Sequence, residues 1–165
     1  MATTYDYVDN STGTAYFGDE IPATRTGRTF VVKRHINLAT AGDSLGATSG
    51  AFAANDVLSV FKVYEGILIT GVAVECTTAE GATLSTEVGD GDDTDGYISA
   101  FDMVATGWFF SGDATYKGDY CDGTTLPGGR LYTAADTIDV KLVTAGADVA
   151  VFDIYIMGID LRPVA

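Results

Sequence analysis

The chain has 165 residues, 47% of them hydrophobic, and its 23 acidic residues outnumber its 9 basic residues to give a formal net charge of −14. This length and apolar content suffice for one domain with its own core, and they exclude a disordered acidic tail. The negative charge excludes nucleic acid as a favoured partner, because the phosphate backbone would be repelled.

Membrane and export signals are also missing from the sequence. No apolar stretch reaches the roughly 20 residues that a membrane helix needs. The first six residues are polar and acidic rather than basic and then apolar. We therefore expect no membrane partner, no secretory signal peptide and synthesis in a reducing cytoplasm.

The first 27 residues follow neither the strand nor the helix period. Aromatic residues are spread among polar residues, Gly and Pro22, a composition that cannot bury enough surface to fold alone. We expect residues 1–27 to form an extended N-terminal arm that lies along the body or on a neighbouring subunit. Spaced aromatic side chains suit docking on a partner. The candidates for this contact are Tyr5, Tyr7, Tyr16 and Phe17.

From Arg28 onward, hydrophobic and polar residues mostly alternate, which is the period of a half-buried β-strand. Ile138, Val140 and Leu142, for example, point to one face, with polar residues between them. Dense Gly and Asp turns favour antiparallel pairing, and no window has the 3.6-residue period of a helix. The sequence therefore predicts an all-β, antiparallel β-sandwich over residues 28–165, with a jelly roll as its wiring. The expected strands span residues 28–36, 58–63, 67–76, 82–88, 97–103, 107–110, 130–133, 137–143 and 149–161.

Charge is unevenly distributed along the chain. Residues 1–56 carry a net charge of −2 and the remaining residues carry −12. The bases of the first part cluster where the arm meets the first long strand, at Arg25, Arg28, Lys33 and Arg34. We expect this group to contact an acidic partner surface while the acidic body keeps similar particles apart. A chance cluster on a solvated strand is the alternative.

The residues that usually carry catalysis are scarce. His35 is the only histidine and sits on an expected strand, where a surface or interface role is favoured over catalysis. No nucleotide-binding, hydrolase or zinc-protease motif occurs. Cys76 and Cys121 stand alone without metal or redox spacing, and we interpret them as free thiols, with a disulfide between them left open. The sequence predicts no enzyme and no cofactor.

Residues 89–96 form the most distinctive local pattern, four aspartates among glycines. Carboxylate oxygens at this density are weak calcium candidates, although the order of residues fails the EF-hand pattern. The favoured interpretation is a turn in which Asp side chains accept backbone N–H bonds and Gly supplies positive φ. The four aspartates are Asp90, Asp92, Asp93 and Asp95.

Residues 108–120 are rich in aromatic side chains that would be able to stack on sugars. The favoured interpretation is a core strand with Trp108 and Phe110 inward and a tyrosine-lined loop outside. The full set comprises Trp108, Phe109, Phe110, Tyr116 and Tyr120.

The segments 56–60, 65–72, 82–90 and 94–98 follow one another in an order of strands and turns that resembles small structural proteins of tailed-bacteriophage virions, including head decoration (cement) proteins built as β-sandwiches. The resemblance covers about 28–161 and carries over no site residues. It implies a protein without enzymatic activity or cofactor that sits on the capsid exterior, often as a homotrimer, and locks neighbouring major capsid subunits together.

We therefore expect a virion structural protein that decorates and stabilises the capsid, is located on the capsid surface and is made in the host bacterial cytoplasm. A phage tail, fibre or adaptor component is the first alternative. A carbohydrate-binding module is the alternative of another class, and a hydrolase is the weakest option.

Overall fold

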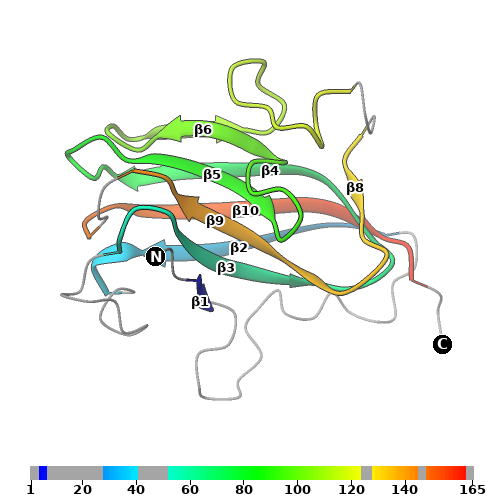
Figure 1. Cartoon of the computed structure of the whole chain (residues 1–165). Coiled ribbons are helices and arrows are strands. Elements are labelled where there is room, and N and C mark those ends of the chain that lie inside the picture. The colour runs from blue at the N-terminus through cyan, green and yellow to red at the C-terminus, as the bar shows by residue number, and fades with distance from the viewer. Residues whose placement is uncertain (1–3, 7–27, 41–51, 124–127, 145–147, 163–165) are drawn as a thin grey trace.

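The structure is a computed structural model that describes residues 4–6, 28–40, 52–123, 128–144 and 148–162. Nearly all of its regular structure is β-strand (Figure 1). The strands are β1 (Thr4–Asp6), β2 (Arg28–Asn37), β3 (Asp56–Val63), β4 (Ile67–Thr78), β5 (Ser85–Asp90), β6 (Ile98–Asp102), β7 (Gly107–Phe110), β8 (Arg130–Leu131), β9 (Asp136–Leu142) and β10 (Val151–Asp160).

Two sheets pack face to face (Figure 1). Sheet A has the strand order β1-β3-β9-β5-β6, and sheet B has the order β2-β10-β4-β7, with β8 also pairing with β4. All pairs are antiparallel except β1 with β3, which is parallel. The predicted all-β antiparallel sandwich is therefore confirmed.

Alternating side chains explain how the two sheets close on one core. On β10, Phe152, Ile154 and Ile156 are at most 1% exposed, and on β9 the inward residues are Ile138 and Val140. Strands with one apolar face bury that face against the other sheet, which is the stable solution for a sandwich. The largest fully buried side chains include Tyr97, Phe52, Phe61, Phe101 and Phe152.

Every strand expected beyond residue 27 occurs, with ends that differ by a few residues. The strand expected over 82–88 begins later, at Ser85, and the strand expected over 130–133 ends earlier, at Leu131. The arm expected over residues 1–27 contributes β1, a three-residue edge strand, and its remaining residues lie outside the described part of the chain. Within the described part, no helix has the length and apolar character to cross a membrane.

Cys76 and Cys121 are both free thiols, as the sequence predicts. Cys76 is buried and Cys121 is half-buried. Burial raises the pKa of both thiols, which lowers their reactivity at neutral pH.

Candidate functional site

The aspartate loop between β5 and β6 is a hydrogen-bonded turn. Asp90 Oδ1 accepts the backbone N–H groups of Asp92 at 3.0 Å and Asp93 at 3.1 Å. Asp93 Oδ1 accepts the N–H of Asp95 at 3.4 Å. The predicted turn, in which Asp side chains satisfy the backbone, is therefore confirmed.

The prediction that the loop's glycines supply positive φ is wrong. The glycines with positive φ among the described residues lie elsewhere, at positions such as Gly66 and Gly81. Gly89 and Gly96 are instead sites of close approach. A Cβ on Gly89 would lie 1.9 Å from the carbonyl oxygen of Asp93, and one on Gly96 would lie 2.3 Å from the ring of Tyr120.

Asp90 is fully buried and anchors a polar network under the loop. Its carboxylate accepts the hydroxyl groups of Tyr120 at 2.9 Å and Tyr132 at 2.7 Å, and Arg130 Nε lies 3.0 Å away. The hydroxyl oxygens of Tyr97 and Tyr132 are 3.0 Å apart. A buried carboxylate is costly unless it is paired and hydrogen-bonded, and these donors meet that requirement.

The network keeps its donors protonated. Burial raises the pKa of Tyr97, Tyr120 and Tyr132 well above its usual range, so each remains a hydroxyl donor at neutral pH. Burial alone would lower the pKa of Arg130, but the hydrogen bond to Asp92 and the charge of Asp90 outweigh it and raise that pKa.

Three carboxylates near this network lie close enough to share a cation. Asp90, Asp92 and Asp136 each have an oxygen within 4.8 Å of the others. Asp93 and Asp95, which belong to the calcium set considered from the sequence, are not in this group. The three clustered carboxylates therefore share only Asp90 and Asp92 with the set that the loop sequence suggests.

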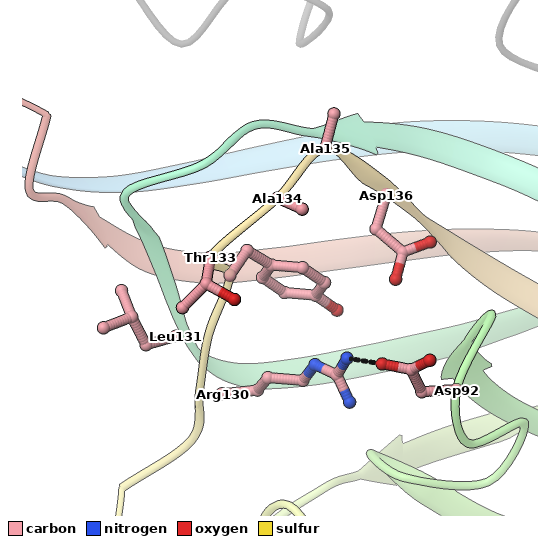
Figure 2. A pocket seen from close by; sticks show the side chains of 8 residues that line it. Asp92, Arg130, Leu131, Thr133, Ala134, Ala135 and Asp136 are labelled. Carbon is pink, nitrogen blue, oxygen red and sulfur yellow. Dashed lines mark hydrogen bonds and ion pairs between the residues drawn. The ribbon is translucent and has the colours of Figure 1, made fainter.

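Arg130 already bridges two of these carboxylates. Its guanidinium group contacts Asp90 and also Asp92, with Nη2 to Oδ2 at 2.5 Å. Figure 2 shows Arg130 pointing at Asp92, with Asp136 nearby, in a pocket of about 220 Å³. Arg130 thus supplies one positive charge next to these three carboxylates and pairs with two of them as an ion-pair network.

The outer face of sheet B carries a second group of functional side chains. The strand register places residues from four strands side by side in two rows. One row is His35, Asp153, Glu75 and Trp108, and the next is Lys33, Tyr155, Ala73 and Phe110.

Two basic residues of β2 enclose a carboxylate on this face. Lys33 Nζ lies 2.5 Å from Asp153 Oδ2, and His35 Nδ1 lies 2.8 Å from Asp153 Oδ1. Burial alone would raise the pKa of Asp153, but the hydrogen bonds from Lys33 and His35 lower it. His35 therefore forms an ion-pair or hydrogen-bond contact on the surface, and no nucleophile hydrogen-bonds to its ring among the described residues.

The aromatic residues of β7 face opposite to the favoured prediction. Trp108 is 47% exposed and Phe110 is 44% exposed, whereas Phe109 is buried against Phe101. The prediction of an inward Trp108 and Phe110 is wrong, because the pairing of β7 with β4 directs Phe109 inward instead. In the following loop, Tyr120 is buried rather than outside, and Tyr116 is half-buried.

These aromatic rings form one exposed cluster. The rings of Trp108 and Phe110 are nearly parallel, at 4°, with centroids 5.7 Å apart. The ring of Tyr155 lies 5.5 Å from that of Trp108. We call Trp108, Phe110 and Tyr155 the aromatic cluster.

The predicted contact residues of the arm are described only in part. Tyr5 lies in β1, where its Cα pairs with that of Leu58 on β3. The others lie outside the described residues, and they are Tyr7, Tyr16, Phe17 and Arg25.

The basic residues of β2 lie on two faces. Arg28 begins the strand, opposite Asp160. Lys33 is exposed on the outer face, whereas Arg34 is buried with its guanidinium 5.5 Å from the ring centre of Phe61. Neighbouring residues on a strand point to opposite faces, so Lys33 and Arg34 do not share one surface.

Sequence reasoning missed Arg130, Tyr120 and Tyr132 as partners of Asp90, and Tyr97 as the neighbour of Tyr132. These residues lie on separate segments that only the folded sheets bring together. The one available signal was Arg130 itself, which is one of only 9 basic residues in a strongly acidic chain.

The fold is shared with capsid chains from two bacteriophages. A chain from the capsid of Ralstonia phage GP4 matches with a TM-score of 0.57 and 12% sequence identity, over 86% of this chain and 89% of that chain. A chain from the acid-stable capsid of Helicobacter pylori bacteriophage KHP30 matches with a TM-score of 0.50 and 14% identity, over 83% of this chain and 90% of that chain. No protein-family model matches, and no curated protein matches by sequence. At these identities, the comparisons establish a common fold.

Proposed function

We propose that this protein is a structural protein of a bacteriophage virion that decorates the outside of the capsid and joins neighbouring major capsid subunits. The observation that carries the proposal is the common fold, which spans nearly the whole of two chains taken from phage capsids. A role in holding a shell together needs surfaces for contact rather than a catalytic centre, and binding to the assembled shell would stabilise it by mass action.

The wiring of the sandwich supports this proposal. Strands β2-β10-β4-β7 face strands β3-β9-β5-β6, and most connections cross from one sheet to the other. This interleaved order supports the jelly-roll wiring that the sequence predicts, and jelly rolls are common in viral capsid proteins.

The contact with the shell is proposed to use the N-terminal arm and the strand that follows it. Lys33 has the exposed position that such a contact needs, whereas the buried Arg34 would support β2 from inside. Two attached contact regions, arm and strand, would raise the effective concentration of each for the shell. The proposed contact set is Tyr5, Tyr7, Tyr16, Phe17, Arg25, Arg28 and Lys33, acting in a homotrimer on the major capsid protein, and the buried Arg34 is removed from the set that the sequence predicts.

The test is to add the purified protein to phage heads that lack it. Co-sedimentation with these heads, together with increased resistance of the heads to heat or chaotrope, is the expected result. Heads that neither bind the protein nor gain resistance would contradict the proposal. Electron microscopy of the bound particle separates the capsid from the alternative location, since density at the tail alone would identify a tail or adaptor component.

A further inference from the structure

The aromatic cluster lies beside a shallow groove at one edge of sheet B. The groove has a volume of about 410 Å³. It is formed at the ends of β4 and β7 by Glu75, Cys76, Thr77, Thr106, Gly107 and Trp108. An indole ring, a carboxylate and hydroxyl groups therefore meet in one open concavity.

Glu75 is held in place but retains an unused acceptor. Tyr155 donates its hydroxyl to Glu75 Oε2 at 3.2 Å. Glu75 Oε1 accepts no hydrogen bond within the described part of the chain. Tyr155 thus orients the carboxylate through one oxygen, and Glu75 lines the groove together with Trp108.

This combination fits a sugar ring. A pyranose has an apolar face of C–H groups and a rim of hydroxyl donors, so its face packs on an aromatic ring while a hydroxyl donates to a carboxylate. Partly exposed tryptophan and tyrosine provide such amphipathic contacts at low entropic cost. A hydrogen bond to a charged acceptor is stronger than one between neutral groups.

The negative charge of the protein restricts the ligands that its exposed aromatic surface would bind. The chain carries −14 overall, and the groove itself contributes Glu75. Phosphorylated or carboxylated sugars would be repelled. A neutral saccharide is not repelled and uses the carboxylate as an acceptor.

We propose that Trp108, Phe110 and Glu75 form a binding site for a neutral pyranose-containing saccharide, with Tyr155 positioning Glu75. The site lies at the β7 edge of sheet B, whereas β2 forms the opposite edge. The two edges share the outer face of sheet B, where Lys33 Nζ lies 5.4 Å from the ring centre of Tyr155. The proposal does not rest on the capsid role.

Trp108 is the only tryptophan in the chain, so its fluorescence reports on this site alone. The probes are neutral gluco-, galacto- and manno-configured oligosaccharides, first on an array and then in solution with the full chain. The expected result is selective, saturable array binding, a blue shift of the Trp108 emission and reduced quenching by acrylamide. Absence of both array binding and a fluorescence change with all of these sugars would overturn the proposal.

Variants separate stacking from hydrogen bonding. Phe110→Ala and Glu75→Gln are each expected to weaken binding about tenfold, the scale of one aromatic contact or one charged hydrogen bond. Tyr155→Phe keeps the ring and removes only the hydroxyl that orients Glu75, so binding falls less and loses its preference among sugar configurations. Leu161→Ala, at a similarly exposed apolar residue outside the groove, is the matched control and binds like the parent protein.

Two further results would contradict the site. The first is unchanged affinity of Phe110→Ala and Glu75→Gln. The second is loss of binding to heads by the same variants, with no sugar bound by the parent protein, which would identify the face as a protein-docking surface. Head binding by the parent protein tests the proposed function separately, so each proposal can fail without the other.

Discussion

At the scale of single residues, Asp90 has the most demanding environment in the described structure. It is fully buried, and two tyrosine hydroxyls, two backbone N–H groups and Arg130 surround its two oxygens. Removing one partner of a buried ionic network leaves the others desolvated and unpaired, which costs more than the lost contact itself. The loop, the following aromatic segment and β8 are therefore held by one carboxylate.

Replacing Asp90 with alanine is expected to lower the free energy of unfolding by about 3–5 kcal/mol, because Arg130 would lose its buried counterion. Urea unfolding followed by circular dichroism measures the difference. Asp113→Ala is the control, since Asp113 is exposed and its carboxylate accepts the N–H of Thr115 at 2.8 Å as its only hydrogen bond among the described residues. This substitution should cost about 1 kcal/mol or less. Equal effects of the two substitutions would show that the network does not act as a unit.

Asp139 is a second buried carboxylate, and one of its two oxygens lacks a hydrogen-bond partner among the described residues. It lies on the outer side of β9, between Ser59 and Gly89 in register, and its Oδ1 has no hydrogen-bond partner among the described residues. Burial raises the pKa of Asp139 above its usual value, and the charges of Asp136 and Asp90 act in the same direction, while hydrogen bonds with Thr137 and Ser59 act against it.

The pH dependence of Asp139→Asn follows from this raised pKa. At a pH between the pKa of Asp139 in the unfolded chain and its higher pKa in the folded protein, the native state binds a proton that the unfolded state does not. The free energy of unfolding therefore rises as the pH falls through this range. The Asn variant has no charge to neutralise, so its advantage over the parent protein is expected to be largest near about pH 7 and to shrink toward about pH 4. Unfolding free energies of both proteins across this range measure the effect, and a constant difference would contradict it. Asp153 has the opposite effect on stability, because folding lowers its pKa. Its contribution to the free energy of unfolding is lost only as the pH falls below the usual pKa of an aspartate.

At the scale of elements, the sequence predicts strands well and strand faces less well. Alternation identifies β9 and its inward residues, because polar side chains occupy every second position. In β7, three aromatic residues follow one another, so no alternation indicates which side chains point to the core. Only the register with β4 places Phe109 inward. β1 is too short to show a period. The partners of Asp90 were not predictable, since no spacing along the chain connects them.

Gly96 tests how closely the aspartate loop packs on the neighbouring aromatic segment. A methyl group there would lie 2.3 Å from the ring of Tyr120, whose hydroxyl is bound to Asp90 and cannot move without cost. We expect Gly96→Ala to destabilise the fold by about 1–3 kcal/mol, the range for overpacking a filled core. Gly112→Ala is the matched control, because a Cβ there meets nothing within 4 Å, and its effect should stay within about 0.5 kcal/mol. Thermal unfolding of both variants provides the comparison, and an unaffected Gly96→Ala protein would mean that the ring adjusts freely.

At the scale of the whole molecule, the two edges of sheet B have different chemistry. The β2 edge carries the basic residues Arg28, Lys33 and His35, whereas the β7 edge carries exposed aromatic rings. The rest of the chain supplies most of the −14 charge. The β2 edge therefore suits contact with an acidic shell, and the β7 edge suits an uncharged ligand. The acidic body would keep similar particles apart.

If the β2 edge faces the shell, the strength of attachment depends on salt in a residue-specific way. Changing Arg25, Arg28 and Lys33 together to glutamine is expected to weaken binding to heads by about threefold per charge at low salt, and much less once the Debye length falls to about 3 Å at 1 M salt. Lys62→Gln is the control, because Lys62 is an exposed base on β3 of the other sheet. The measurement is the affinity of labelled protein for heads as a function of salt concentration. A Lys62 variant that loses as much affinity as the β2 variant would show that net charge alone, rather than this edge, governs attachment.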